Sequence, residues 1–271
     1  MVRVIKQALR ANPRDARLVA GLPYAMNYAG DLDPREIFEA HAAYGRLVKE
    51  MAPGEHLPPR VDLNPARKLR LGVLSGDLRT HAVGFFAEPL LAGHDREQFE
   101  IVCYSTTEHE DATSRRLAGY VSLWRNVSKE NPLSLNTVVR NDKIDLLLEY
   151  SGLSAGHRLP MLHLRPAPVQ ITYFGYPNTT GIAACDYRIV DSYTDPREPW
   201  YDALAVEKLW RLDPCFLCYS PPEGLPEPAT SPSTRGEPFT FGSFNALSKL
   251  DDLTIAMMAG AMKEVPGDTA S

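Results

Sequence analysis

The sequence predicts an α/β fold: a Rossmann-like, doubly wound parallel sheet preceded by a short α-helical cap. Residues 1–50 carry apolar side chains at helical spacing, which predicts a helical cap assigned to residues 1–60. From residue 68 onward, short apolar runs alternate with helical stretches, the pattern of βα units and a parallel sheet. The runs Leu71-Gly-Val-Leu and Ile144-Asp-Leu-Leu-Leu look covered on both faces, as strands inside such a sheet should be.

The cap is predicted to contain helices at residues 2–11, 16–28 and 34–51. Asn12-Pro13-Arg14-Asp15 separates the first two, and Asp33 followed by Pro34 is a typical helix start. Two helices joined by an Asn-Pro turn are typical of a TPR unit. The segment holds one incomplete repeat at most, and a solenoid needs about three. We therefore expect a TPR-like cap on the sheet rather than a superhelix.

The first Rossmann-like lobe is assigned to residues 68–212. Strands are predicted at 69–75, 99–105, 123–127, 144–150, 169–174 and 187–190, and helices at 83–92, 112–118, 134–141 and 154–164. In such sheets ligands bind beyond the carboxyl ends of the strands. His81 and the segments 149–152 and 175–180 each follow a strand, so we expect all three on one rim.

A second lobe is predicted to begin near the end of the sequence. Residues 213–238 are rich in proline, with glycine, serine and glutamate, and form an expected linker. Residues 239–271 contain a predicted strand at 239–244, a loop and a predicted helix at 253–265. This strand, loop and helix would start a second nucleotide-binding lobe that is cut short.

Composition narrows the function classes. The chain has 271 residues and a net charge of -5, with scattered basic residues, so nucleic acid is not an expected partner. It has no membrane-length apolar run and no long apolar leader, which predicts a cytoplasmic protein without a membrane partner. Cys215 and Cys218 form a lone C-x-x-C, and no histidine pair has metal-ligand spacing. We therefore expect reduced, partly buried thiols and no metal.

Three motifs carry the functional signal. The most informative is 165–181, where an apolar strand leads into a bend built from Gly175, Pro177, Thr179, Thr180 and Gly181. Backbone N–H groups and hydroxyls gathered there suit a phosphate or sugar ligand, although a plain turn has similar composition. The other two motifs are Ser75-Gly-Asp-Leu-Arg-Thr-His81 and Phe244-Asn-Ala-Leu-Ser-Lys249.

Taken together, and in their order along the chain, the three motifs resemble the O-GlcNAc transferase family, which includes bacterial TPR-linked, SPINDLY-like members. The resemblance runs from about residue 18 to residue 266. It implies a GT-B enzyme with two Rossmann-like lobes facing a cleft. The implied reaction transfers N-acetylglucosamine from UDP-GlcNAc to a Ser or Thr hydroxyl of a protein acceptor, with inversion. The family's fold type usually works without a metal, and no cofactor is implied.

The resemblance also implies roles for individual residues. His81 matches the active-site histidine, which would bind the donor and serve as the candidate base; a helix-capping histidine is the alternative reading. Lys249 matches the lysine with which the family binds the diphosphate of the donor. The alternative is a solvated surface lysine. The loop beside the donor sugar is matched by Phe174, Gly175 and Pro177. Thr179 and Thr180 would add hydroxyl contacts to the donor, unless they only cap the turn.

Two departures from the family pattern bear on the donor. Ala246 stands where animal members commonly carry a glutamine on the nucleotide, and Leu153 replaces a histidine of the bacterial pattern. Two alternatives therefore stay open. One is a fucosyltransferase that uses GDP-fucose. The other is a non-catalytic interaction module or remnant of such an enzyme.

Overall fold

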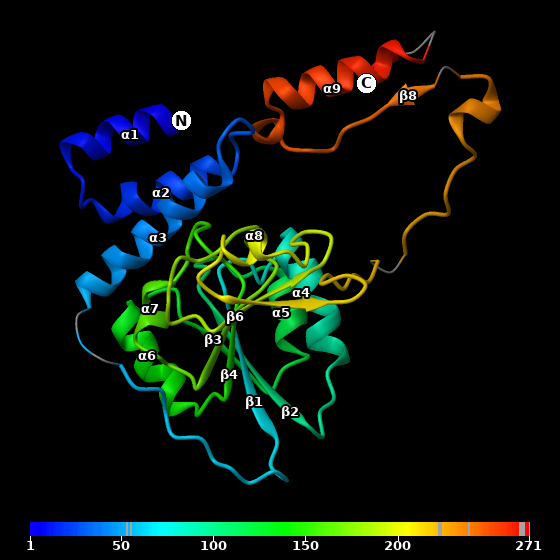
Figure 1. The fold of residues 1–271 in the computed structure, drawn as a ribbon. Coiled ribbons are helices and arrows are strands. Elements are labelled where there is room, and N and C mark those ends of the chain that lie inside the picture. The colour runs from blue at the N-terminus through cyan, green and yellow to red at the C-terminus, as the bar shows by residue number, and fades with distance from the viewer. Residues whose placement is uncertain (53, 55, 222–223, 238, 266–268, 271) are drawn as a thin grey trace.

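A seven-stranded parallel sheet forms the centre of the protein (Figure 1). The structure is a computed structural model that describes residues 1–271 except 53, 55, 222–223, 238, 266–268 and 271. The sheet order is β3-β2-β1-β4-β5-β6-β7. The strands are β1 Leu69–Ser75, β2 Phe99–Ser105, β3 Leu123–Asn126, β4 Leu146–Glu149, β5 Val169–Thr172, β6 Tyr187–Asp191 and β7 Lys208–Leu212. The predicted Rossmann-like α/β fold is confirmed.

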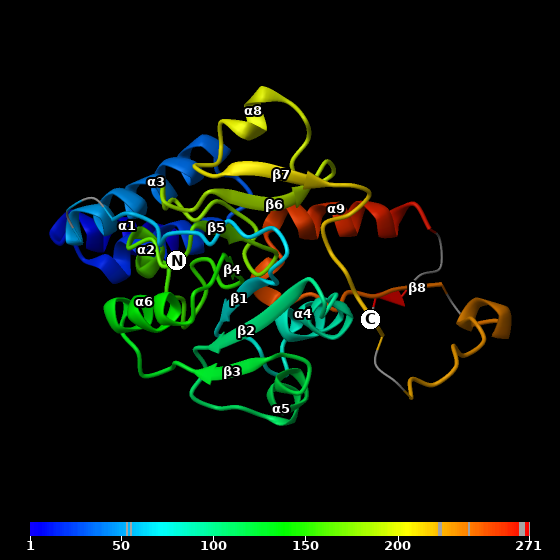
Figure 2. The ribbon, with the colours of Figure 1, turned by 90° about the horizontal axis from the view of Figure 1, so that it is seen from below.

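Helices cover both faces of the sheet (Figure 2). On one face, α4 (Ala82–Gly93) and α5 (Ala112–Ala118) pack on Val73, Ile101 and Cys103. The alternate residues Leu74, Val102 and Tyr104 point to the other face, because neighbouring side chains of a strand point in opposite directions. That face is covered by α6 (Pro132–Asn141), α7 (Pro160–His163) and the cap. Both faces of the central strands are therefore buried.

The cap consists of α1 (Val2–Ala11), α2 (Ala16–Met26) and α3 (Pro34–Met51). Asp15 caps α2 and Asp33 caps α3 by accepting backbone N–H groups of their first turns. The cap packs closely on the loop between β5 and β6 at Gly45 of α3, where an added Cβ would lie 1.6 Å from the Gly181 carbonyl oxygen. Any larger residue at position 45 would push the cap away from the sheet.

α8 (Pro199–Asp202) lies between β6 and β7. The chain after β7 leaves the lobe and returns to the cap. Its elements are the 3-10 turns η1 (Pro232–Arg235) and η2 (Leu247–Lys249), β8 (Thr240–Phe241), α9 (Asp252–Lys263) and β9 (Thr269–Ala270). β8 and β9 form a separate parallel pair. α9 begins beside the α2–α3 turn (Figure 1), where the Asp251 carboxylate lies against Gly30. Within the described part of the chain, no helix has the length and apolar character needed to cross a membrane.

The structure shortens one predicted helix and contains two further elements that were not predicted. The helix predicted at 154–164 is reduced to Pro160–His163. Gly152 and Gly156 have φ values of 52° and 79°, and this left-handed backbone holds the segment before Pro160 in turns. β7 and α8 were not predicted. β7 is the last strand in the sheet order, and its Trp210 is 51% exposed, so it lacks the apolar signature of the inner strands.

The cysteines also differ from expectation in part. Cys103 and Cys185 are buried free thiols. Cys215 and Cys218 are free as well but exposed, not partly buried. Phe216 between them packs on Tyr173, with ring centroids 6.3 Å apart. The C-x-x-C segment is thus held to the sheet by an aromatic contact.

Candidate functional site

A cleft of about 830 Å³ lies beyond the carboxyl ends of the central strands. Its floor and one wall come from the loops after β1, β4 and β5, and the facing wall comes from the end of α2 and from Lys249 and Asp251. Five predicted site residues line this single cleft: His81, Phe174, Gly175, Pro177 and Lys249. The structure therefore brings together groups contributed by three separate sequence motifs.

His81 is both a helix cap and a cleft residue. It precedes α4, and its Nδ1 accepts a hydrogen bond from the Val83 N–H at 3.2 Å. The side chain is 41% exposed, and its Nδ1 lies 3.9 Å from a carboxylate oxygen of Asp77. An accepting Nδ1 places the proton of the neutral ring on Nε2. In this geometry the His81 Nε2–H can donate a hydrogen bond to a ligand. To act as a base, His81 would have to use Nδ1, and it would then lose the hydrogen bond from the Val83 N–H that caps α4.

The bend after β5 admits only glycine at position 175. The Gly175 N–H donates to the Tyr173 carbonyl oxygen at 2.6 Å. A Cβ on Gly175 would lie 1.4 Å from the Tyr150 carbonyl oxygen. Phe174 packs on Tyr150 with ring centroids 4.5 Å apart and ring planes tilted by 42°. The bend is thus pressed against the loop after β4, and its backbone forms part of the cleft surface.

Tyr176 ties this bend to the cap. Its hydroxyl accepts a hydrogen bond from the Asn27 side-chain amide at 2.7 Å. His41 Nδ1 lies 2.8 Å from the Ile37 carbonyl oxygen, which can only accept, so His41 Nε2 is unprotonated. The Tyr176 hydroxyl therefore donates to His41 Nε2, at 2.9 Å. Burial lowers the pKa of His41 to about 4, and the ring stays neutral near pH 7.

We expect Tyr176→Phe to lower the free energy of unfolding by about 1–3 kcal/mol, because it leaves the buried His41 acceptor unpaired. Urea denaturation would measure this loss. Tyr193→Phe is the control, because Tyr193 is 83% exposed. Equal stability of the two variants would contradict the role of this network.

Thr179 and Thr180 lie beneath the cleft and do not line it. Both are fully buried. The Thr179 hydroxyl donates to Glu207 at 2.6 Å, and the Thr180 N–H donates to the same carboxylate at 2.8 Å. The Thr180 hydroxyl also donates to Glu207. The two threonines were expected to contact a ligand, and this placement corrects that expectation. A buried carboxylate needs hydrogen-bond donors. Glu207, which directly precedes the unpredicted β7, accepts hydrogen bonds from both threonine hydroxyls.

Glu149, at the end of β4, builds the loop beside the bend. It is fully buried and accepts hydrogen bonds from the backbone N–H groups of Ser151 at 2.8 Å and Gly152 at 2.9 Å. Burial raises the pKa of Glu149 from 4.5 to about 7, against the lowering effect of those N–H groups. Its carboxyl group is therefore a structural acceptor, as expected for a lone acid at a strand end.

Glu149 should make stability pH-dependent. Its pKa is higher in the folded state than the ordinary 4.5, so the folded state binds the proton more tightly. The stability it contributes is complete below about pH 4.5 and is lost as the pH rises through about 7. We expect Glu149→Gln to flatten the unfolding free energy over this interval, measured by urea denaturation at several pH values. Glu97→Gln, whose side chain is 91% exposed, should not. Parallel profiles for the parent and Glu149→Gln would refute this.

Two cations face the cleft. Lys249 reaches it from η2, and no carboxylate among the described residues lies within 4 Å of its ammonium group. Arg79 also lines the cleft, and its guanidinium group lies 3.4 Å from a carboxylate oxygen of Asp77. It was not predicted as a site residue, although its position two residues before His81 could have indicated it. Asn27 and Tyr176 were missed as well, and no sequence pattern links them. Lys249 and Arg79 give the cleft positive charge suited to a phosphate-bearing ligand.

A Rossmann-like lobe whose strand-end cleft carries a histidine, a glycine bend and two cations has the features of a nucleotide-sugar glycosyltransferase. The model of glycosyl transferase family 41 matches residues 48–218. This chain belongs to that glycosyltransferase family. The family resemblance predicted from the three motifs is confirmed.

Known proteins agree with this assignment. The chain is 38% identical over 251 residues to the probable UDP-N-acetylglucosamine–peptide N-acetylglucosaminyltransferase SPINDLY of Arabidopsis thaliana, covering 89% of this chain and 27% of that protein. The corresponding Solanum lycopersicum protein is 36% identical over 247 residues, covering 89% and 26%. A mutant of Thermobaculum terrenum O-GlcNAc transferase superposes with a TM-score of 0.90 at 35% identity, covering 99% of this chain and 50% of that one. The chain thus spans about a quarter of the length of these curated relatives.

Proposed function

We propose that this chain is part of a protein O-glycosyltransferase that moves N-acetylglucosamine from UDP to a Ser or Thr hydroxyl with inversion. The observation that carries this proposal is the meeting of His81, the Gly175 bend and Lys249 in one cleft of about 830 Å³. This size fits a nucleotide sugar. Relatives whose names specify the same donor and a peptide acceptor support the choice of substrates.

The proposed chemistry is a single displacement at the anomeric carbon. The acceptor oxygen forms the new bond, the bond to the diphosphate oxygen breaks, and UDP leaves with the electron pair. Lys249 and Arg79 stabilise the growing negative charge on the leaving group. Cations held in the cleft in this way can take the place of a divalent metal, so we propose metal-independent transfer.

In this scheme His81 positions the reacting groups. Its Nδ1 holds the first turn of α4, so Nε2–H can donate to the sugar or to a phosphate oxygen. The Gly175 and Pro177 backbone shapes the sugar pocket, because the bend leaves no room for a side chain at position 175. The proton of the acceptor hydroxyl passes to solvent water, because His81 Nδ1 is occupied by the Val83 N–H while the helix cap is intact.

Nucleotide selectivity tests the proposal. Calorimetric titration of the chain with UDP and with GDP should show UDP binding at least tenfold tighter, and equal amounts of EDTA or Mg²⁺ should leave the UDP affinity unchanged. His81→Ala should weaken UDP or UDP-GlcNAc binding, whereas His94→Ala, outside the cleft lining, should not. Preference for GDP would favour fucosyl transfer. Failure to bind either nucleotide would favour the non-catalytic module.

A further inference from the structure

A further pocket adjoins the cleft on the side of the cap. It has a volume of about 470 Å³ and lies between the start of α1, the end of α2 and the η2 turn. Residues 1–3 contribute one wall, and Ser248 contributes another. Tyr24 and Tyr28 line both this pocket and the cleft. The two hollows therefore share a wall, and we call the smaller one the cap pocket.

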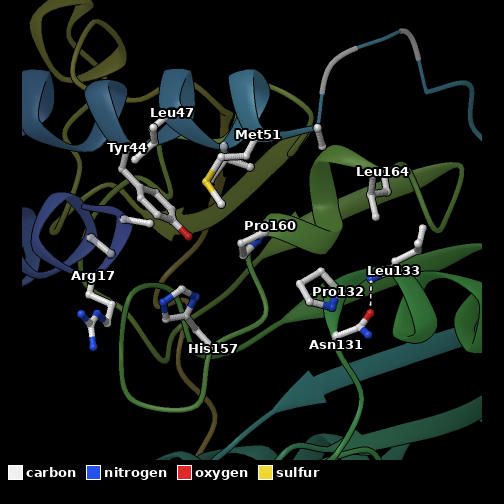
Figure 3. A pocket seen from close by; sticks show the side chains of 14 residues that line it. Arg17, Tyr44, Leu47, Met51, Asn131, Pro132, Leu133, His157, Pro160 and Leu164 are labelled. Carbon is white, nitrogen blue, oxygen red and sulfur yellow. Dashed lines mark hydrogen bonds between the residues drawn. The ribbon is translucent and has the colours of Figure 1, made fainter. Parts of the chain in front are cut away.

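A cavity elsewhere in the protein has no such link to the cleft. It measures about 500 Å³ and lies between the cap and the α6–α7 side of the sheet (Figure 3). Figure 3 shows Tyr44, Leu47 and Met51 of α3 along one wall, with Pro132 and Leu133 at the start of α6 across from them. None of its lining residues lines the cleft. The cap pocket, and not this cavity, can therefore contact a substrate that extends out of the cleft.

Arg3 gives the cap pocket a positive charge. The residue is exposed and lines the pocket. Lys6, about one turn further along α1, is paired with Glu36, whereas Arg3 has no ion-pair partner within the described part of the chain. Among the described residues, no aspartate or glutamate lines the pocket. The Arg3 guanidinium group is therefore available to a negatively charged group of a ligand.

The shared tyrosine wall supplies a hydrogen-bond donor. The hydroxyl oxygens of Tyr24 and Tyr28 are 3.3 Å apart. Only one of the two hydroxyl hydrogens is used in this bond, so the other has no acceptor among the described residues. Ser248 adds a further hydroxyl. Donors beside a single guanidinium group suit a carboxylate, which only accepts hydrogen bonds, whereas phosphate recognition typically uses a cluster of arginines.

We propose that the cap pocket binds a carboxylate side chain of the acceptor polypeptide while the acceptor Ser or Thr lies in the cleft. Arg3 is then a specificity-determining residue, and acceptors with an aspartate or glutamate near the modified residue are preferred. This role of Arg3 rests on the proposed transferase function. Because an extended chain advances by about 3.3 Å per residue and the two hollows share a wall, we expect the carboxylate within roughly five residues of the acceptor hydroxyl.

The test compares the binding of two peptides to the intact chain by calorimetric titration in the presence of UDP. Each peptide contains one Ser, flanked three and four residues away on both sides by Asp in one peptide and by Asn in the other. We expect the Asp peptide to bind about two- to fivefold tighter at low salt, the effect of one solvent-exposed ion pair. The ratio should approach one at about 1 M NaCl, where such charges are screened. Arg3→Gln should remove the preference, and Arg3→Glu should reverse it.

Arg10→Gln is the matched control. Arg10 is exposed on the same helix, has no ion-pair partner in the described part of the chain and lies outside the pocket lining, so its replacement should leave the preference unchanged. Equal binding of the two peptides, or an unchanged preference in Arg3→Gln, would overturn the role of Arg3 even if UDP binds. Failure of UDP to bind, with the preference for the Asp peptide intact, would refute the proposed transfer but not carboxylate binding in the cap pocket.

Discussion

In the proposed transfer reaction, replacing Lys249 with alanine is expected to slow glycosyl transfer by about 100- to 1000-fold and to weaken UDP binding at least tenfold. Lys249 faces the cleft, and no carboxylate among the described residues neutralises it within ion-pair distance. In the proposed reaction its ammonium group can therefore face the departing diphosphate. The loss of one such electrostatic contact in a preorganised site typically costs this much in rate.

The measurement is UDP release with a Ser-containing acceptor peptide, accompanied by UDP titration. Lys263→Ala is the matched control, because Lys263 lies in the last turn of α9 and outside the cleft lining. Wild-type transfer and UDP affinity in Lys249→Ala would remove Lys249 from the site. Arg79→Ala should give a smaller loss, because the Asp77 carboxylate already takes part of the Arg79 charge.

Glu207→Leu is expected to destabilise the protein by about 3 kcal/mol or more. Glu207 is 4% exposed and accepts hydrogen bonds from both threonine hydroxyls of the bend and from the Thr180 N–H. Leucine would leave these donors buried and unpaired, at about 1–3 kcal/mol for each group that cannot find another partner. The bend after β5 would loosen at the same time.

Glu207→Gln separates the loss of hydrogen bonds from the change in shape. Its amide oxygen can still accept from Thr180. Only the Thr179 hydroxyl, which already accepts from the Gly181 N–H at 3.3 Å and the Val206 N–H at 3.2 Å, would lose its acceptor. We expect Glu207→Gln to lose less than half of what Glu207→Leu loses, measured by urea denaturation. Glu227→Leu, an exposed site, should be nearly neutral. Equal losses in Glu207→Gln and Glu207→Leu would show that charge, rather than donor pairing, holds the bend.

Local signals explain which parts of the fold could be predicted. The helix at 34–51 was predicted with its observed bounds, because Asp33, Pro34 and the apolar period all lie in adjacent residues. The inner strands carry continuous apolar runs and were found to within a few residues. β7 was missed because an edge strand with an exposed Trp210 has no such run. The helix predicted at 154–164 failed because left-handed glycines override apolar spacing.

In the candidate site as well, only the residues with a local sequence signal could be predicted. His81, Gly175, Pro177 and Lys249 could be selected because the family motifs contain them, and the structure places all four in one cleft. The partners of Tyr176 could not, because Asn27 and His41 lie 149 and 135 residues away in the sequence. The threonine hydroxyls were assigned to a ligand because their acceptor, Glu207, belongs to an edge of the sheet that the sequence did not reveal.

The distribution of thiols gives the protein a natural reporter. Cys103 and Cys185 are shielded, whereas Cys215 and Cys218 are accessible and flank Phe216 and Leu217 of the cleft wall. A fluorescent maleimide added to the unmodified protein would consequently attach beside the cleft and nowhere in the interior. The rate of that labelling, followed with and without nucleotide, would read out occupancy without any engineered cysteine.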